Sequence, residues 1–277
     1  MTSAQKIEER TERDQQAPEP QDSGSKQPSK GSKGPGLASK LARYLIMPAF
    51  LIAVCAALYL WVSGLELDSI EQRTLNQEYI VQRVLQHLEI SAYATVIVVA
   101  LAVTTGVILT RPFMSSVSEY IVSVASIGQA IPSIGVIVIM AMVIAFNFRI
   151  AVIALIIYAF LPVLRNTMVG IRQVDSSVIE AGRGMGMTKM SVLFRIEMPL
   201  AIPIMLAGIR TALIIVVGTT TLATFIDAGG MGDIINSGIK LSRNSILVTG
   251  AVLTGVLALT IDYIAGIVED VLRPKGL

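Results

Sequence analysis

The segment Glu180 to Pro199, EAGRGMGMTKMSVLFRIEMP, decides how the chain is organised. It is polar and rich in glycine, and long apolar runs precede and follow it. Its charged residues would each cost several kcal/mol at bilayer depth, so we interpret it as a water-exposed loop of a membrane protein. The spacing of its apolar residues predicts two short helices with a face that contains Met185, Met187 and Met190. Such a face suits docking into the groove of a partner protein.

The composition supports the membrane class. Of 277 residues, 53% are hydrophobic and 15% are charged, and the mean hydropathy is +0.68, which is too apolar for a soluble domain. The net charge of +2 gives no reason to expect a nucleic-acid partner. Cys55 and His87 are the single cysteine and histidine, so the sequence offers neither a disulfide framework nor a Cys/His metal site. We expect an all-α integral membrane protein surrounded by lipid.

The first 40 residues are rich in Gln, Glu, Lys, Ser, Pro and Gly and poor in apolar residues. We expect residues 1–40 to form a disordered cytoplasmic tail, because they bury too little apolar surface to offset the entropy of ordering. The tail does not resemble a signal peptide, since the apolar run that follows is too late and too long.

Six apolar runs predict six transmembrane helices. They are residues 44–64, 90–109, 117–146, 151–164, 201–226 and 246–267. Most Lys and Arg residues, including Arg43, Arg111, Arg165 and Arg273, fall in the segments that this topology assigns to the cytoplasm, so both termini are predicted to be cytoplasmic. Residues 41–86 then comprise the first span and an external loop, residues 87–268 a membrane core, and residues 269–277 a cytoplasmic tail.

The third run is interrupted at Ile131-Pro132-Ser133, where proline predicts a kink or break. Irregular backbone inside a membrane needs cover from protein or a water-filled path. Gln129, Pro132 and Ser133 are therefore candidates for the translocation path, and a simple packing kink is the alternative. Thr220 and Thr221 are further candidates, although small and hydroxyl residues also serve close helix packing.

Two charges lie within the last two runs. Arg210 follows Pro199 by eleven residues and Asp262 precedes Arg273 by eleven, which places both roughly 16 Å from the same membrane face. We predict that they pair, either as a latch on the inner gate or as a fixed salt bridge. His87 could sense protons, but a lone histidine near an interface favours a bystander role.

The opening segment resembles the EAA signature of permease subunits of ATP-driven importers. Glu180, Ala181, Gly186, Ile196 and Pro199 are in register with that signature, while Gly182 replaces its second alanine and Met198 its leucine. The resemblance implies that this loop rests in a cleft of a cytoplasmic ATPase and couples ATP hydrolysis to transport.

From about residue 87 to residue 266 the chain is similar to permeases of the glycine betaine/carnitine/choline importer family, in the strings QAIPSIG (129–135), LPVLRNTMVGI (161–171), AGIRTA and GGMGD. This resemblance implies the type I ABC importer (MetI-like) permease fold in a bacterial inner membrane. It also implies alternating access, an ATPase subunit dimer, a second permease chain and an extracytoplasmic substrate-binding protein. An importer of methionine or another amino acid is the nearest alternative.

No ATP-binding G-x-x-x-x-G-K-[ST] segment, metalloprotease motif or paired catalytic carboxylate is present. We therefore expect no enzyme activity and no cofactor in this chain, with ATP bound by the partner subunit.

Overall fold

The computed structural model describes residues 37–272, with side chains from residue 43 onward. Residues 1–42 form a part separate from residues 43–277, and the description below concerns the second part. Of the predicted tail, residues 1–36 lie outside the described residues. Residues 37–40 belong to the first described helix.

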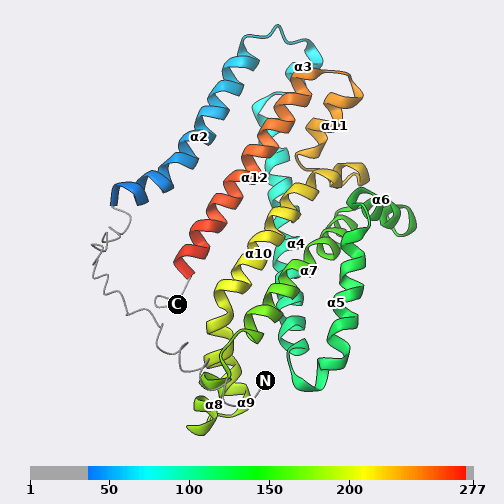
Figure 1. The fold of residues 1–277 in the computed structure, drawn as a ribbon. Helices are drawn as coiled ribbons and strands as arrows, with labels where there is room; N and C mark the ends of the chain where they lie inside the picture. Colours follow the sequence, from blue (N-terminus) through cyan, green and yellow to red (C-terminus); the bar gives the residue numbers. More distant parts are fainter. Residues whose placement is uncertain (1–36, 273–277) are drawn as a thin grey trace, which may run out of the picture. The chain divides into compact units, whose positions relative to one another are not determined.

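Every regular element in the described range is a helix (Figure 1). The α-helices are α2 (Leu37–Ser63), α3 (Ser69–Thr74), α4 (Gln77–Leu109), α5 (Ser115–Ala130), α6 (Ser133–Val143), α7 (Phe148–Arg172), α8 (Ser176–Gly184), α9 (Lys189–Val192), α10 (Met198–Thr220), α11 (Gly232–Lys240) and α12 (Asn244–Leu272). The 3₁₀-helices η1 (Pro112–Met114) and η3 (Thr221–Ile226) and the π-turn η2 (Leu193–Glu197) complete the set.

Five of these helical segments are long and apolar enough to cross a membrane. They are Tyr44–Ser63, Gln77–Leu109, Phe148–Arg172, Lys189–Ile226 and Asn244–Leu272. A sixth candidate is the pair Pro112–Ala130 and Ser133–Val143, which bends by 93° at the break. The prediction of an all-helical, multi-pass membrane protein is confirmed, and the predicted break lies where Pro132 ends α5 and precedes α6.

The core lies where α4, α7 and α10 pack together. Ala94, Ala102, Ala159 and Ala212 are fully buried there. A Cβ atom added to Gly208 would lie only 2.4 Å from Cβ of Asn166. Small side chains let the helix backbones approach closely. This packing therefore depends on alanine and glycine residues, whose role a hydropathy profile does not reveal.

Several predicted spans are shorter than the helices that contain them. The span predicted to begin at residue 90 belongs to α4, which begins at Gln77, because the polar residues before it continue the helical pattern. α7 continues through Pro162 to Arg172, so Arg165 lies inside this helix and not in a loop after it. α12 likewise extends to Leu272, beyond the predicted boundary at residue 268.

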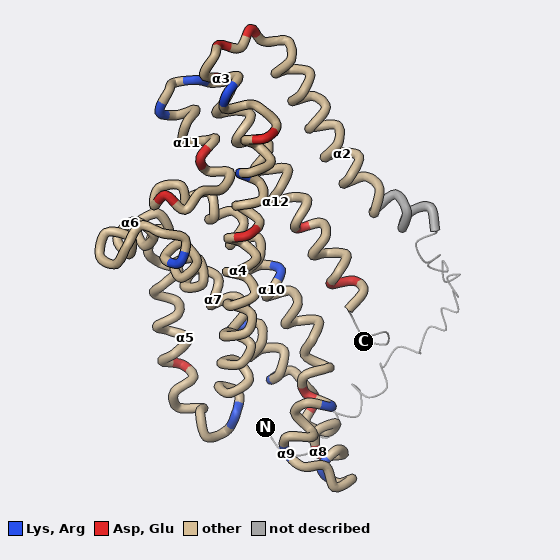
Figure 2. The backbone as a smooth tube through the Cα atoms, turned by 180° about the vertical axis from the view of Figure 1, so that it is seen from behind, with Lys and Arg blue, Asp and Glu red and all other residues tan. Residues whose placement is uncertain are grey.

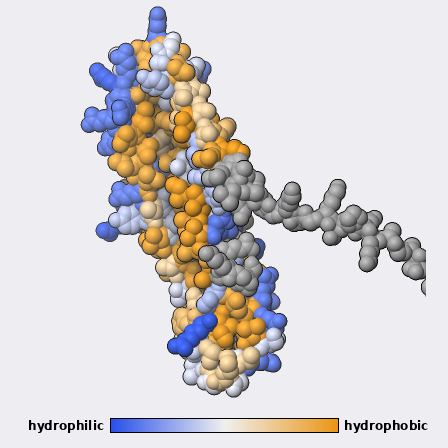
Figure 3. Space-filling model, turned by 90° about the vertical axis from the view of Figure 1, so that its left-hand side faces the viewer, coloured by the Kyte–Doolittle hydropathy of each residue, from blue (hydrophilic) through white to orange (hydrophobic). Residues whose placement is uncertain are grey.

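Charged residues are concentrated near α3 and α11 and near α8 and α9, with a smaller group midway on α10 and α12 (Figure 2). In the face shown in Figure 3, apolar side chains cover most of the middle. This distribution fits a chain whose middle lies in lipid and whose two ends lie in water.

Hydrogen bonds fix α3 to the start of α12. Asp68 caps α3, accepting from the backbone N–H of Glu71 at 2.8 Å, and it pairs with Arg243 at 2.6 Å. The Ser245 hydroxyl donates to Glu71. These bonds hold the pKa of Asp68 low, chiefly through the Glu71 amide, and the pKa of Glu71 low, chiefly through Ser245.

Candidate functional site

The segment 180–199 begins within α8. Asp175 caps this helix by accepting from the Ser177 backbone N–H at 2.8 Å, a bond that lowers the pKa of its carboxyl group. The helix ends in a turn in which Gly186 has φ +86°. Two hydrogen bonds close the turn, from the Gly186 N–H to the Arg183 carbonyl and from the Met187 N–H to the Gly182 carbonyl. This is the Schellman arrangement, which requires a residue that tolerates positive φ.

The chain folds back at this turn, so α8 packs on the segment that follows it. A Cβ atom added at Gly182 would lie 2.6 Å from Cδ1 of Ile196, so an alanine at this position would force the isoleucine to move. The small departure from the signature at Gly182 therefore has a packing reason. Glu180, Ala181 and Met185 are exposed on the outer side of α8.

The second short helix that we predicted is not separate. α9 continues through the π-turn Leu193–Glu197 into α10, and Lys189–Ile226 runs as one helical segment. Pro199 is the second residue of α10, directly after the π-turn, where the regular α-helical hydrogen bonding is already interrupted, so its missing N–H fits this place. A displacement of residues 189–197 therefore acts directly on a membrane-spanning helix.

An ion pair joins the π-turn to the end of α4. Nη2 of Arg111 lies 2.6 Å from Oε2 of Glu197, whose side chain is 8% exposed. The same guanidinium also donates to the Thr110 hydroxyl and the Val107 carbonyl. Sequence reasoning missed this pair, because Arg111 was assigned to a flank and Glu197 to the loop, with 86 residues between them.

The break between α5 and α6 brings polar groups together beside α7. The Gln129 side-chain amide donates to the Tyr158 carbonyl at 2.8 Å, and the Tyr158 side chain is hydrogen bonded to Ser133. Pro132 is exposed at the bend. Ser126 lies about one turn before Gln129 on α5, and its hydroxyl accepts a hydrogen bond of 3.0 Å from Nη2 of Arg165 on α7.

The two threonine candidates have different surroundings. Thr220 is fully buried and its hydroxyl lies 3.1 Å from that of Ser91, so in this conformation it joins α10 to α4. Thr221 begins η3, and its hydroxyl donates to the Gly218 carbonyl. η3, which Thr221 begins, packs against α6, the helix that follows the break, and no hydrogen bond of either threonine in residues 43–272 reaches Gln129 or Ser133.

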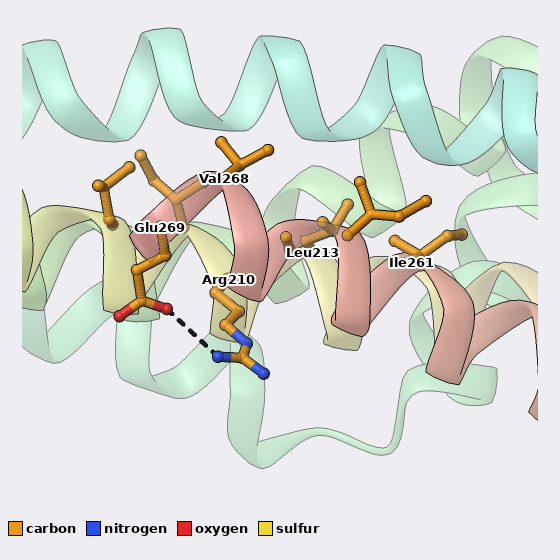
Figure 4. A pocket seen from close by; sticks show the side chains of 9 residues that line it. Arg210, Leu213, Ile261, Val268 and Glu269 are labelled. Carbon is orange, nitrogen blue, oxygen red and sulfur yellow. Dashed lines mark hydrogen bonds and ion pairs between the residues drawn. The ribbon is translucent and has the colours of Figure 1, made fainter. Parts of the chain in front are cut away.

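Arg210 and Asp262 form a bidentate pair between α10 and α12, with Nε–Oδ1 and Nη2–Oδ2 distances of 2.7 and 3.0 Å. Glu269 adds a third member, which sequence reasoning missed, at 3.3 Å from Nη1 of Arg210 (Figure 4). Glu269 lies seven residues after Asp262, hence two turns along the same helix face. All three side chains are about one-third exposed.

His87 lies near the start of α4, at the other end of that helix from Arg111. It joins α4 to α10 and to the loop before α11. It is fully buried. Its Nδ1 accepts from the Met231 N–H at 3.3 Å, so Nε2 carries the proton and donates to the Val217 carbonyl at 3.0 Å. Gly230, at φ +93°, packs against the ring. The bonding of both ring nitrogens gives His87 a cross-linking role, for which its isolation in the sequence gave no sign.

Next to His87, Asp233 in the GGMGD string pairs with Arg83 at 2.7 Å and accepts from the Thr224 hydroxyl. The loop and α11 thereby pack onto the bundle, and Ile234 is completely buried.

Comparison with known proteins identifies the family of this chain. Residues 102–275 match the family model described as "Binding-protein-dependent transport system inner membrane component". The chain is 40% identical to "Carnitine transport permease protein OpuCB" of Listeria monocytogenes over 192 residues, which are 69% of this chain and 87% of that protein. It is also 40% identical to "Glycine betaine/carnitine/choline transport system permease protein OpuCB" of Bacillus subtilis (strain 168), over 69% of this chain and 88% of that protein.

Among solved structures, the chain is similar to one in "Inward facing conformations of the MetNI methionine ABC transporter", with a TM-score of 0.64 at 21% sequence identity. The match covers 75% of this chain and all of the other. At this identity the similarity concerns the fold alone.

Proposed function

Because the chain belongs to the family of binding-protein-dependent transport system inner membrane components, we propose that it is the permease subunit of an ATP-driven importer of quaternary ammonium osmoprotectants. Glycine betaine, carnitine and choline are the candidate substrates. The observation that carries this proposal is the 40% identity to permeases named for these compounds, over more than two thirds of the chain.

In this proposal the end that bears α8 and the π-turn faces the cytoplasm. Its exposed residues Glu180, Ala181 and Met185 dock into a cleft of an ATPase subunit, and two such ATPases serve the complex. The exposure of this surface and the rigid turn at Gly186 support the assignment. Both chain termini are then cytoplasmic, and α3 and α11 lie outside.

Closure of the ATPase dimer around ATP moves α8 and the π-turn. Since α9, the π-turn and α10 are continuous, the displacement passes directly into α10. Arg111 transmits part of it to the end of α4 through Glu197. The resulting tilt of the spans alternates access between an external binding protein and the cytoplasm.

One chain provides half of the pathway, so a second permease chain, identical or paralogous, completes it. The polar groups at the α5–α6 break line the path in this proposal, because irregular backbone in a membrane needs such cover. Thr220 and Thr221 are weaker candidates, since Thr220 is buried in helix packing. The Arg210, Asp262 and Glu269 cluster serves as a latch between α10 and α12.

Transport is tested with the complete complex, in which this permease, its ATPase, its binding protein and any second permease are reconstituted in proteoliposomes. We expect ATP-dependent uptake of labelled glycine betaine, carnitine or choline, and none when the ATPase cannot hydrolyse ATP. Uptake of methionine in place of all three would support the amino-acid alternative and contradict the substrate proposal. Uptake without ATPase would contradict the importer class.

The orientation is tested by labelling single cysteines in whole cells. With Cys55→Ser as background, Lys189→Cys and Lys240→Cys provide a matched pair, because both lysines are exposed at opposite ends of the bundle. We expect an impermeant thiol reagent added outside to label residue 240 and not residue 189. Labelling of residue 189 from outside would overturn the coupling assignment.

A further inference from the structure

Arg165 is a charged residue well inside a membrane-spanning helix. It lies seven residues before the end of α7 at Arg172, which corresponds to roughly 10 Å along the helix axis. Its side chain is exposed, and its guanidinium meets the Ser126 hydroxyl eleven residues after the start of α5. The guanidinium is thus directed toward the middle of α5.

Four other arginines in residues 43–272 have carboxylate partners, whereas Arg73, Arg149, Arg172, Arg183 and Arg195, like Arg165, have no ion pair there. The pairs are Arg83–Asp233, Arg111–Glu197, Arg210–Asp262 and Arg243–Asp68. Within residues 43–272, no carboxylate lies within ion-pair distance of Arg165, and its side-chain bond is to a neutral hydroxyl. A cation on a membrane-spanning helix is stable only beside water or an anion, so the surroundings of Arg165 in the working protein must supply one of them.

The groups nearest to Arg165 form a continuous polar line. Ser126 and Gln129 are three residues apart on one face of α5. Gln129 donates to the Tyr158 carbonyl, and Tyr158 lies seven residues before Arg165, on the same face of α7. Ser133, bonded to Tyr158, extends the line to the start of α6. Neutral donors and acceptors therefore lead from the helix break to one unneutralised guanidinium.

From this arrangement we infer that Arg165 binds the carboxylate of a zwitterionic substrate as it passes the α5–α6 break. A guanidinium binds a carboxylate through two parallel hydrogen bonds, which a hydroxyl cannot reproduce. The inference rests on the proposed function and refines it. Glycine betaine and carnitine carry a carboxylate beside the quaternary ammonium, whereas choline carries a hydroxyl. Arg165 thus favours the zwitterions and contributes little to passage of choline.

The test compares Arg165→Gln with the unaltered permease in the complete reconstituted complex, using glycine betaine and choline as substrates. We expect the variant to lose about tenfold or more in kcat/KM for glycine betaine, as for a lost charged hydrogen bond, and to keep choline uptake within about twofold. Arg165→Lys, which keeps the charge but not the paired donors, should give an intermediate loss for glycine betaine. Arg149→Gln, an exposed arginine at the other end of α7, is the matched control and should change neither substrate.

Equal losses for both substrates, or no loss for either, would overturn the inference while the proposed function stands. If the unaltered complex carries neither compound, the proposed function fails first and the carboxylate assignment fails with it.

A second measurement does not depend on the substrate. In the Cys55→Ser background, Arg165→Cys should react with a water-soluble thiol reagent in the purified complex, whereas Ala159→Cys, fully buried one and a half turns earlier on α7, should not. Lack of reaction at residue 165 would show that no water-filled path reaches it and would overturn the inference.

Discussion

Oε2 of Glu197 accepts a 2.6 Å hydrogen bond from Nη2 of Arg111, which joins the π-turn before α10 to the end of α4. The glutamate is nearly buried and the arginine is about one-quarter exposed. The two residues connect the surface proposed to receive force from the ATPase with the end of α4. Variants of this pair therefore allow its contribution to the stability of the fold to be measured separately from its role in coupling.

Arg111→Met should destabilise the permease by about 1–3 kcal/mol, because it leaves the Glu197 carboxylate nearly buried without its partner. Adding Glu197→Gln should recover part of this loss, since the double variant holds no unpaired charge. The free energy of unfolding, measured by denaturing detergent in mixed micelles, checks both values. Additive losses would show that the two side chains do not interact energetically.

Gly186→Val should uncouple ATP hydrolysis from uptake while the subunit still inserts into the membrane. A branched side chain at φ +86° costs at least about 1–2 kcal/mol, so the turn after α8 would rearrange. The measurement is the number of ATP molecules hydrolysed per substrate imported.

Gly184→Ala provides the control for this variant. It is helical, and an added Cβ meets nothing within 4 Å, so it should leave the coupling ratio unchanged. If Gly186→Val also transports with the normal ratio, the turn has no coupling role.

The Arg210 cluster should respond unequally to loss of its two carboxylates. Asp262→Asn removes the charge from a bidentate contact at 2.7 and 3.0 Å, whereas Glu269→Gln affects a single contact at 3.3 Å. We expect a several-fold larger fall in uptake for Asp262→Asn, with membrane abundance held equal. Normal uptake in both Asp262→Asn and Arg210→Gln would eliminate the latch and leave a packing role.

Substitution at His87 should separate its two hydrogen bonds. His87→Ala leaves the buried Met231 N–H without an acceptor and should cost about 1–3 kcal/mol, in addition to the cavity. The oxygen of an asparagine can occupy the place of Nδ1 and should retain the Met231 bond. Thermal unfolding in detergent should therefore rank His87→Asn above His87→Ala, and equal midpoints would contradict the cross-link.

Acidification should loosen α3 from α12. The folded-state pKa values of Asp68 and Glu71 are lowered, so these carboxylates stabilise the folded state above their ordinary values of 3.8 and 4.5. This stabilisation is lost as the pH falls below about 4.5 and through the lower folded-state values. Hydrogen exchange at residues 69–74 should rise in this range, and Glu71→Gln should reduce the change. Constant protection would show that the cap does not depend on these charges.

The sequence by itself determined the membrane class, the helical architecture, the break at Pro132 and the family, because each depends on local features. Hydrophobic run length, a missing backbone donor and fixed motif spacing need no tertiary contact to be recognised. The register of the EAA signature also predicts a water-exposed segment at Glu180 and Gly186, which are exposed, and at Pro199, which is half-buried at the start of α10. The helix ends were less predictable, since polar residues continue a helix wherever neighbouring helices satisfy them.

Only the tertiary structure decided which side chains meet. It joined Arg111 to Glu197, added Glu269 to Arg210 and Asp262, and placed both nitrogens of His87 in hydrogen bonds. It also turned Arg165 from a presumed flanking charge into one that lies inside α7 and reaches α5. These contacts join residues 29 or more positions apart on different helices, in most cases more than 50, and no local pattern specifies which faces of two packed helices will touch.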